Sequence, residues 1–407
     1  MPESRHVSLA AARRSPRCAG GLARSGLAMC LLLACAATAI AAESPFAPGR
    51  SGPAELRLID GVPVLIVAGT PEQIGRQKAE LTATVLERLA DYPVRLLALV
   101  GREGDSPKLV ERARALVEHA PADHRAEMRA FAEASRADAD VGILANTFVD
   151  MYRGGFGCSS LIVEPPRSAT GNPIFGRNLD FINLGILSRH GLVTIYRPSG
   201  KRAFATVGFP GLFGCLSGMN DAGLAIAVHE VYLSRDGAPM FDPEGVPYLF
   251  LFREILESCA TVDQAEQLLR QRRRTTKLNL ACCDRRRGAV FELTPRTVAV
   301  RAAEDGLLAC TNHFRTEELA VLSLCRRYAK LRDVKPDEKL DRQAVAAKLD
   351  AVNQGRLTIQ TMIFEPVELR LHVAMGSCPS SALPLRTIEL RGLFQSEADD
   401  ARSAPSR

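Results

Sequence analysis

The sequence reads Phe156-Gly157-Cys158-Ser159-Ser160 before an apolar run, and a second apolar run ends in Gly176-Arg177-Asn178-Leu179-Asp180. Between them lies Thr170-Gly171-Asn172-Pro173, residue types that favour a turn between two strands. A hairpin of this kind brings the thiol of Cys158 close to Arg177 and Asp180. A thiol beside a fixed cation and a carboxylate suits a cysteine nucleophile. The alternative interpretation is a buried structural cysteine next to a surface ion pair.

The composition is that of a globular protein and gives no support to a nucleic-acid partner. The chain has 407 residues, 46% hydrophobic and 24% charged, which is enough for a large core. Five arginines against one glutamate in residues 1–42 account for most of the net charge of +6. The rest of the chain therefore lacks a basic surface field, and it has no tryptophan for base stacking.

The N-terminus is typical of an export signal. A basic stretch precedes the apolar run Leu27–Ala37, and Ala39-Ile40-Ala41 follows as a cleavage site. We expect residues 1–42 to be a signal peptide and the mature protein to be exported to the periplasm or outside the cell. The run is too short for a membrane span, so no stable membrane insertion is expected. Lipid anchoring through Cys35 is the less favoured alternative, because Leu32-Leu33-Ala34-Cys35 only partly matches a lipoprotein box.

The cysteines indicate neither a metal nor a cofactor. No C-x-x-C pair occurs, so neither a zinc ribbon nor a thioredoxin-type site is expected, and we predict no cofactor. An oxidising compartment permits disulfides, whose pairing the sequence leaves open. Cysteines other than Cys158 are interpreted as small buried hydrophobes or disulfide partners; the four considered are Cys215, Cys282, Cys283 and Cys310.

Residues 43–157 are predicted to form a mainly helical segment. A strand pair is expected at 58–67, turning at Asp60-Gly61. Thr70-Pro71-Glu72-Gln73 then has the residues of a helix start, and helical periodicity continues to about Tyr152. Breaks fall near 101–107 and 120–122.

After Cys158 the pattern changes to short strands. They run to about Glu230 and are followed by two helices (248–259 and 261–270), by strands, by helices at 317–332 and 341–352, and by strands at 359–365 and 369–374. This order favours an α+β layered sandwich over an alternating βαβ fold. We predict a catalytic domain over residues 158–394 and a disordered polar tail at 395–407.

Cys158 follows the flexible run Gly154-Gly155-Phe156-Gly157, where a strained peptide can present its carbonyl to the thiol. An N→S acyl shift and thioester hydrolysis would then cut the chain between Gly157 and Cys158. A free α-amine titrates near ~7.7–8.0, so it can act as the general base for its own thiol.

Six features occur in order along the chain: Cys158-Ser159-Ser160, Gly176-Arg177-Asn178-Leu179-Asp180, Asn220-Asp221-Ala222-Gly223-Leu224, Glu230, Thr311-Asn312-His313 and Arg327-Tyr328. Together they resemble the linear-amide branch of the N-terminal-nucleophile hydrolases. That branch includes choloylglycine hydrolase, penicillin V acylase, isopenicillin-N acyltransferase, acid ceramidase and N-acylethanolamine acid amidase. The resemblance covers about residues 60–375 and implies a four-layer αββα sandwich.

The resemblance implies a role for each matching residue. Cys158 would be the nucleophile and, after cleavage, the source of the base, with Asp180 orienting its amine. Arg177 would favour the thiolate and Asn312 would donate to the oxyanion. Arg327 would pair with Asp180 or with the end of the sheet.

Two features of the chain resemble the ceramidase type more than the bile-salt type. Glu230 stands where bile-salt and penicillin hydrolases carry asparagine, and a glutamate must be protonated to stabilise an oxyanion, which implies an acidic or desolvated site. The long segment before Cys158 resembles an internal prosegment. We expect it to stay associated after excision, as a heterodimer.

The sequence thus predicts an amidase that acts on a linear, non-peptide C–N bond of a small N-acyl substrate through a thioester on Cys158. The alternatives are an acyltransferase that uses the same thioester and a non-catalytic binding protein on this fold. The loop 208–213 is apolar and is a candidate wall for the acyl group or simply part of the core. His229 and His313 can equally be core or rim histidines.

Overall fold

The computed structural model describes residues 44–395, with the exception of 90, 100, 102, 153–155 and 322–323. The expected signal peptide, the lipoprotein-type Cys35 and nearly all of the expected tail lie outside the described residues. Among the residues described, no helix has the length and apolar composition needed to cross a bilayer.

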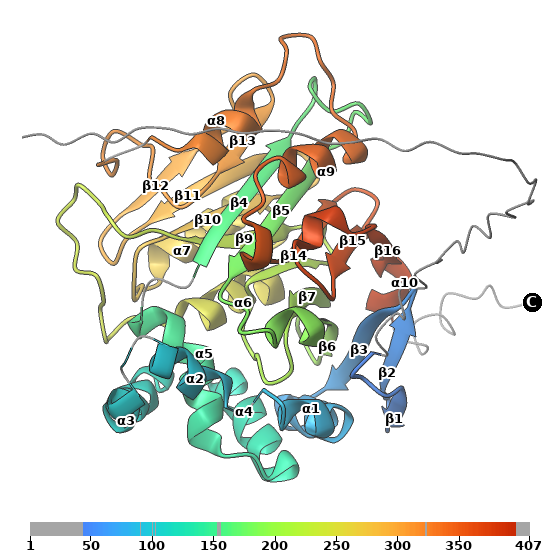
Figure 1. Cartoon of the computed structure of the whole chain (residues 1–407), viewed down its shortest axis with the longest axis vertical. Coiled ribbons are helices and arrows are strands. Elements are labelled where there is room, and N and C mark those ends of the chain that lie inside the picture. Colours follow the sequence, from blue (N-terminus) through green and yellow to red (C-terminus); the bar gives the residue numbers. More distant parts are fainter. Residues whose placement is uncertain are drawn as a thin grey trace, which may run out of the picture. The chain divides into compact units, whose positions relative to one another are not determined.

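Cys158 lies in a six-stranded sheet with the strand order β13-β4-β5-β14-β15-β16. All neighbouring pairs in it are antiparallel, and β4 and β5 lie side by side in Figure 1 as its second and third strands counted from β13. The strands are β4 (Phe156–Val163), β5 (Ile174–Phe181), β13 (Leu307–Cys310), β14 (Thr358–Glu365), β15 (Arg370–Met375) and β16 (Arg386–Glu389).

The second sheet has ten strands in the order β1-β2-β3-β6-β7-β8-β9-β10-β11-β12. Its strands are β1 (Gly49–Ser51), β2 (Ala54–Ile59), β3 (Val62–Gly69), β6 (Leu192–Pro198), β7 (Phe204–Gly208), β8 (Ser217–Asn220), β9 (Ala225–Glu230), β10 (Leu278–Cys283), β11 (Gly288–Leu293) and β12 (Val298–Arg301). Most side chains of β9, β10 and β11 are buried, as expected for strands covered on both faces.

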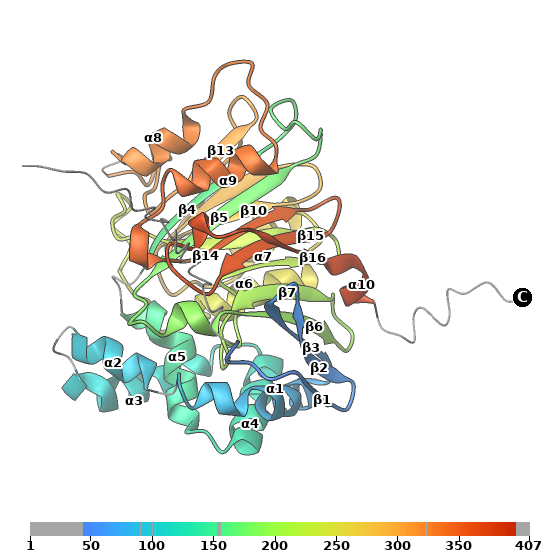
Figure 2. The same cartoon turned by 45° about the vertical axis from the view of Figure 1, so that its right-hand side comes forward.

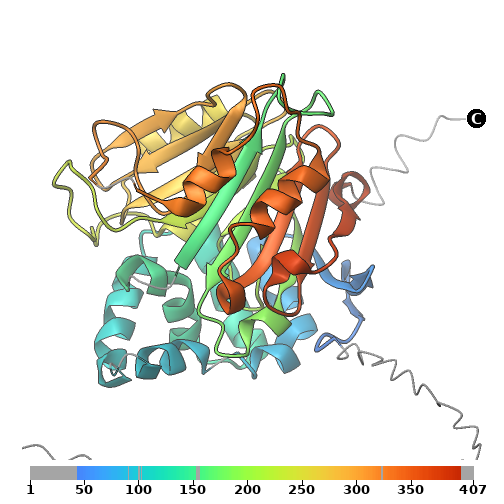
Figure 3. The same ribbon diagram turned by 45° about the horizontal axis from the view of Figure 1, so that its top comes forward.

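The two sheets pack face to face between two layers of helices. Helices α6 (Tyr248–Ser258) and α7 (Val262–Gln271) contact the ten-stranded sheet, whereas α8 (Arg326–Arg332) and α9 (Arg342–Asp350) cover the six-stranded one (Figure 3). One apolar core joins residues of both sheets, and α10 (Leu390–Phe394) closes the described chain beside β15. The predicted α+β layered sandwich is confirmed.

The segment before Cys158 is mainly helical and also extends the larger sheet. Its helices gather at one end of the molecule (Figures 1 and 2): α1 (Pro71–Leu86), α2 (Tyr92–Leu99), α3 (Ser106–Val117), α4 (Ala122–Ser135) and α5 (Ala139–Met151). Thr70 caps α1 with the expected capping box. Strand β3 pairs in parallel with β6, so the segment and the part after Cys158 share one hydrogen-bonded sheet.

One predicted helix is much shorter than expected. The helix predicted at 317–332 begins only at Arg326. Residues 317–319 form only a turn. Just before it, the buried carboxylate of Glu292 accepts hydrogen bonds from the backbone N–H groups of Arg315 and Thr316. Leu319 packs there in a small apolar cluster. Tertiary contacts override helix propensity in this segment.

A buried network of charges joins the helical segment to the rest of the molecule. Lys78 of α1 and Arg253 of α6 both contact Glu127 of α4, at 2.9 and 2.7 Å. Arg253 also contacts Glu257, which pairs with His124 at 2.9 Å. Burial alone would raise the pKa of Glu127, but Arg253 and Lys78 hold it below its ordinary value. The ion pairs require α1, α4 and α6 to keep one arrangement, since an unpaired buried charge is costly.

Replacing Glu127→Gln should lower the free energy of unfolding by about 3–5 kcal/mol, because Lys78 and Arg253 lose their shared carboxylate in the interior. Urea denaturation of the full chain measures this loss. Glu118→Gln is the control, because its ion pair with Arg125 is exposed and should contribute at most about 1 kcal/mol. Equal effects of the two substitutions would contradict the assignment of the network as a structural anchor.

Candidate active site

Cys158 points into the space between the two sheets. In the β4–β5 pairing Cys158 lies opposite Leu179 and Ser160 lies opposite Arg177, so these four side chains share one face. That face meets the larger sheet, since Ser160 Oγ lies 2.9 Å from His229 Nε2 and Arg177 Nη1 donates to the carbonyl of Val228. The predicted hairpin is therefore present, with the thiol and Arg177 on its inner face.

Burial controls the ionisation of the thiol in the uncut chain. Cys158 has no exposed surface, and this burial raises the pKa of its thiol. The positive charge of Arg177 opposes the rise only in part. Nε and Nη2 of Arg177 are buried and have no hydrogen-bond partner among the described residues, so they are donors available to a negative charge near the sulfur.

Asn312 and Arg327 hold the backbone of Cys158 on both sides of the residue. The N–H of Cys158 donates to Asn312 Oδ1 at 2.8 Å, and Arg327 Nη1 donates to the carbonyl of Cys158 at 2.7 Å. Arg327 Nη2 also donates to Asn312 Oδ1, at 2.9 Å. Residues from three separate segments of the chain thus form one closed set of hydrogen bonds around the predicted cleavage site.

The orientation of the Asn312 amide follows from its neighbours. Its oxygen faces two donors, and its nitrogen donates to the backbone carbonyl of Glu230 at 2.9 Å. The chain around it is fixed by Asn279 of β10, which donates to the carbonyls of Thr311 and His313. One N–H of the Asn312 amide remains for a further acceptor beyond the Glu230 carbonyl.

Asp180 lies on the opposite face of the hairpin from the thiol. Its two oxygens accept hydrogen bonds from Thr358 and Gln354, each at 2.6 Å, and Arg327 Nη1 lies 3.6 Å away. Burial raises the pKa of Asp180, and these hydrogen bonds together with the charge of Arg327 oppose the rise. Through Arg327, the carboxyl group is linked to the carbonyl of Cys158.

Gly157 pairs with Asp180 in the regular β4–β5 ladder. Its φ lies outside the left-handed region, so the backbone shows no sign there of the expected strain. A Cβ atom at this position would collide with the amide of Gln354, the same amide that holds Asp180. A side chain at this position would displace the Gln354 amide from Asp180, so the preference for glycine here comes from close approach rather than from an unusual turn.

His229 and Glu230 are the last two residues of β9 and lie next to Ser160 and Asn312. Glu230 is 3% exposed, and one of its carboxylate oxygens accepts a hydrogen bond from Tyr232 at 2.9 Å. Its backbone carbonyl is the group that contacts Asn312. Burial lowers the pKa of His229 well below its ordinary value, with the charges of Arg177 and Arg327 adding to the effect. A neutral, buried His229 next to Ser160 fits a core histidine.

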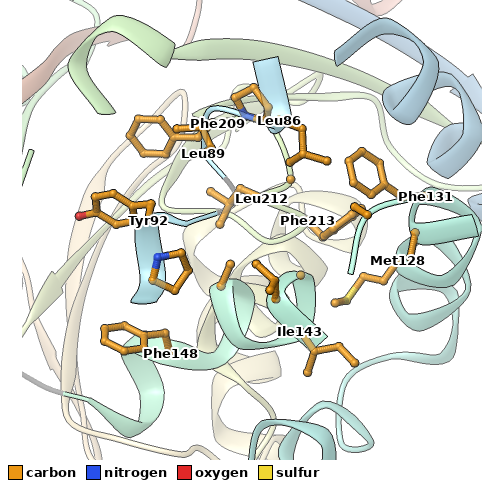
Figure 4. A pocket seen from close by; sticks show the side chains of 18 of the residues that line it. Leu86, Leu89, Tyr92, Met128, Phe131, Ile143, Phe148, Phe209, Leu212 and Phe213 are labelled. Carbon is orange, nitrogen blue, oxygen red and sulfur yellow. The ribbon is translucent and has the colours of Figure 1, made fainter. Parts of the chain in front are cut away.

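A cavity of about 670 Å³ lies beside this site and is mostly apolar (Figure 4). Leu179, the strand partner of Cys158, forms part of its wall, and so do residues 209–213. The opposite wall comes from α1, α2, α4 and α5, with Phe131 and Phe148 among the side chains labelled in Figure 4. The loop proposed from sequence therefore lines an apolar pocket that also reaches Leu179 of β5, the strand paired with the one that carries Cys158.

Cys325 is a second thiol near the site, and sequence analysis missed it. All eight described cysteines are free. Burial works to raise the pKa of Cys325, but His313, the backbone N–H of Tyr328, Thr311 and the charge of Arg327 together lower it to about 6. No local motif marks this residue, because its neighbours come together only through the tertiary fold.

Other contacts at the site were equally invisible in the sequence. Gln354, Thr358 and Asn279 hold Asp180 and the Asn312 segment, yet each lies far from its partner along the chain. Among the described residues, no group of three or more His, Cys, Asp or Glu side chains could hold a metal ion.

Cys325 should react with iodoacetamide half-maximally near pH 6, because the thiolate is the reactive form and its pKa lies near that value. Mass spectrometry of the Cys158→Ala chain, labelled over a range of pH, measures this for each thiol. Cys378 is the internal control, since burial raises the pKa of its thiol and its labelling should need a higher pH. Identical pH profiles for the two cysteines would disprove the assignment.

Comparison with known proteins places the chain in a family. Residues 168–377 match the family described as acyl-coenzyme A:6-aminopenicillanic acid acyl-transferase, a range that contains all the candidate residues except Gly157 and Cys158. No curated protein sequence matches the chain.

Three solved structures resemble parts of it. An N-acylethanolamine-hydrolyzing acid amidase ortholog from Caenorhabditis elegans is 19% identical, with a TM-score of 0.41 over 55% of this chain and 95% of that one. A mutant conjugated bile acid hydrolase from Clostridium perfringens is 15% identical (TM-score 0.38; 59% and 95% covered). Penicillin V acylase from Agrobacterium tumefaciens is 12% identical (TM-score 0.38; 56% and 84%). Because the family match spans more than half of its length, the chain belongs to the acyl-coenzyme A:6-aminopenicillanic acid acyl-transferase family.

Proposed function

We propose that this protein is an exported cysteine amidase that cuts its own Gly157–Cys158 bond and then hydrolyses a linear amide of an N-acyl substrate. The observation that carries the proposal is the closed set of hydrogen bonds among Cys158, Asn312 and Arg327, with Asp180 next to Arg327. These polar groups converge on the N–H and carbonyl groups of Cys158, directly or through Arg327, although they come from four separate segments of the chain.

Self-cleavage begins at the thiol. The sulfur of Cys158 attacks the carbonyl carbon of Gly157, the C–N bond breaks, and the nitrogen becomes the α-amine of Cys158. Water then hydrolyses the resulting thioester and releases Gly157 as a carboxylate. Arg177 supports this step, because its unpartnered donors can stabilise the thiolate in a buried site.

The new amine supplies the base for turnover. It takes the proton from the Cys158 thiol, and the sulfur attacks the substrate carbonyl to form a tetrahedral oxyanion. Asn312 has an N–H available for that oxyanion. The substrate amine leaves with a proton, and water hydrolyses the acyl-thioester. Arg327 holds Asn312 and the carbonyl of Cys158 in position by donating a hydrogen bond to each.

The cavity favours an apolar acyl group as the part of the substrate that is bound. Its volume of about 670 Å³ lies within the range of ~300–1,000 Å³ typical of small-molecule sites. Because Leu179 lines the cavity and pairs with Cys158, we expect an acyl chain in the cavity to place its carbonyl end toward the sulfur.

The segment before Cys158 is proposed to remain bound after cleavage. Strand β3 stays paired with β6 through backbone hydrogen bonds that the cut does not touch. Asp150, a few residues before the cut, accepts hydrogen bonds from the backbone of Tyr248 and the hydroxyl of Thr275. These contacts support a heterodimer of residues 43–157 and 158–407.

Purified wild-type protein should consist of two co-eluting fragments, and N-terminal sequencing should find a terminus at Cys158. Cys158→Ala should stay intact, because it has no sulfur to accept the acyl group. The control is Cys310→Ala, which removes a buried thiol from the neighbouring strand and should still be cut. An intact wild type with full amidase activity would rule out the autoproteolytic mechanism.

Acyl transfer is the second candidate, and the family match favours it because the family is described by that reaction. The same thioester would then be attacked by an amine acceptor in place of water. The ratio of free acid to new amide, measured with and without an added primary amine, separates the two. We expect the acid to dominate; a new amide as the main product at millimolar amine would overturn the hydrolase assignment.

A further inference from the structure

We propose that Asn146 and Lys78, both in the segment before Cys158, determine which acyl chains fit the cavity by fixing the backbone of the loop 209–213. This inference rests on the proposed function, since it concerns the acyl pocket of that reaction. Neither residue touches Cys158, so both are positioning residues.

Asn146 of α5 binds the loop at two points. Its amide nitrogen donates to the carbonyl of Gly211 at 2.8 Å, and its oxygen accepts from the N–H of Phe213 at 2.7 Å. Its remaining N–H donates to the carbonyl of Gly142 within α5. Asn146 is fully buried, so water cannot replace these bonds and the amide has only one orientation that satisfies them.

Lys78 and Arg253 hold the next two carbonyls of the loop. Lys78 Nζ donates to the carbonyl of Leu212 at 3.3 Å, and Arg253 Nη1 donates to that of Phe213 at 2.8 Å. Both cations are buried and pair with Glu127. Lys78 also donates to the hydroxyl of Tyr196 and lies 4.0 Å from the centre of the Phe213 ring. Its position is thus set by several partners at once.

The fixed backbone carries the side chains that shape the pocket. Phe209, Leu212 and Phe213 belong to the cavity wall and are labelled around it in Figure 4. Because four backbone groups of residues 211–213 bond to buried side chains, these apolar side chains cannot shift without leaving polar groups unpaired. The space available to an acyl chain therefore depends on Asn146 and Lys78.

The test measures binding in the full-length Cys158→Ala chain, which removes the chemistry. Calorimetry gives dissociation constants for straight-chain N-acyl amides of increasing acyl length. In Asn146→Leu, which has a similar volume but no hydrogen bonds to the loop, the ratio of long-chain to short-chain affinity should change by about tenfold or more, the discrimination that one or two methylene groups give in a fitted pocket.

Thr147→Val is the matched control. Thr147 is equally buried in the same helix, and its hydroxyl donates only within that helix, to the carbonyl of Ile143. The affinity ratio should stay within about twofold of the parent, even if the variant is less stable. Lys78→Met is the second test if Asn146→Leu does not fold, because Glu127 keeps Arg253 as a partner.

The inference would be overturned by an affinity ratio that is the same in the Cys158→Ala parent and in the folded variants. It would also be overturned if that parent bound none of the N-acyl amides. Turnover of the same amides by the wild type is measured separately. If the wild type does not turn over these amides but the affinity ratio depends on Asn146, only the proposed reaction is rejected. Normal turnover with an unchanged ratio would reject only the role of the two residues.

Discussion

The register of β4 against β5 is the constraint on which the site depends. With Cys158 opposite Leu179, the thiol faces the space between the sheets, while Asp180 lies on the other face beside Gln354 and Arg327. A slip of one residue would exchange the two faces and separate the sulfur from Arg177. Pairing with β13 and β14 on either side fixes this register, since each has its own buried face.

In the uncut chain, the surroundings of Cys158, the proposed nucleophile, disfavour its reactive thiolate form. Burial raises the pKa of the Cys158 thiol, although the guanidinium of Arg177 lies close by. The neighbouring Cys325, less buried and with more donors around it, has the opposite shift. The lowered thiol pKa and the proposed catalytic position therefore belong to two different cysteines, Cys325 and Cys158. A thiol that depends on its own α-amine for activation can remain inert until that amine exists.

Local chemistry in the sequence predicted the hairpin, the capped start of α1 and the change from helices to strands at Cys158. It failed where distant residues decide the structure: the helix expected at 317–332 begins only at Arg326, and Leu319 packs in a cluster with Val231 and Ala299. The candidate residues Asn312 and Arg327 came from the resemblance, which also implied that Arg327 pairs with Asp180. The other contacts of these residues were not predicted. Gln354, whose amide donates to Asp180 and lies against Gly157, has no sequence signal because its partners lie nearly two hundred residues away.

The parallel pairing of β3 with β6 affects how the protein can refold and how long it stays folded. If the chain is cut at Gly157, one sheet is built from two polypeptides, and refolding becomes a bimolecular process that depends on concentration. The uncut chain folds with both parts tethered and avoids that cost. The processed form would then persist mainly through slow unfolding rather than through a reversible equilibrium. Each molecule can therefore assemble this sheet efficiently only before it is cut.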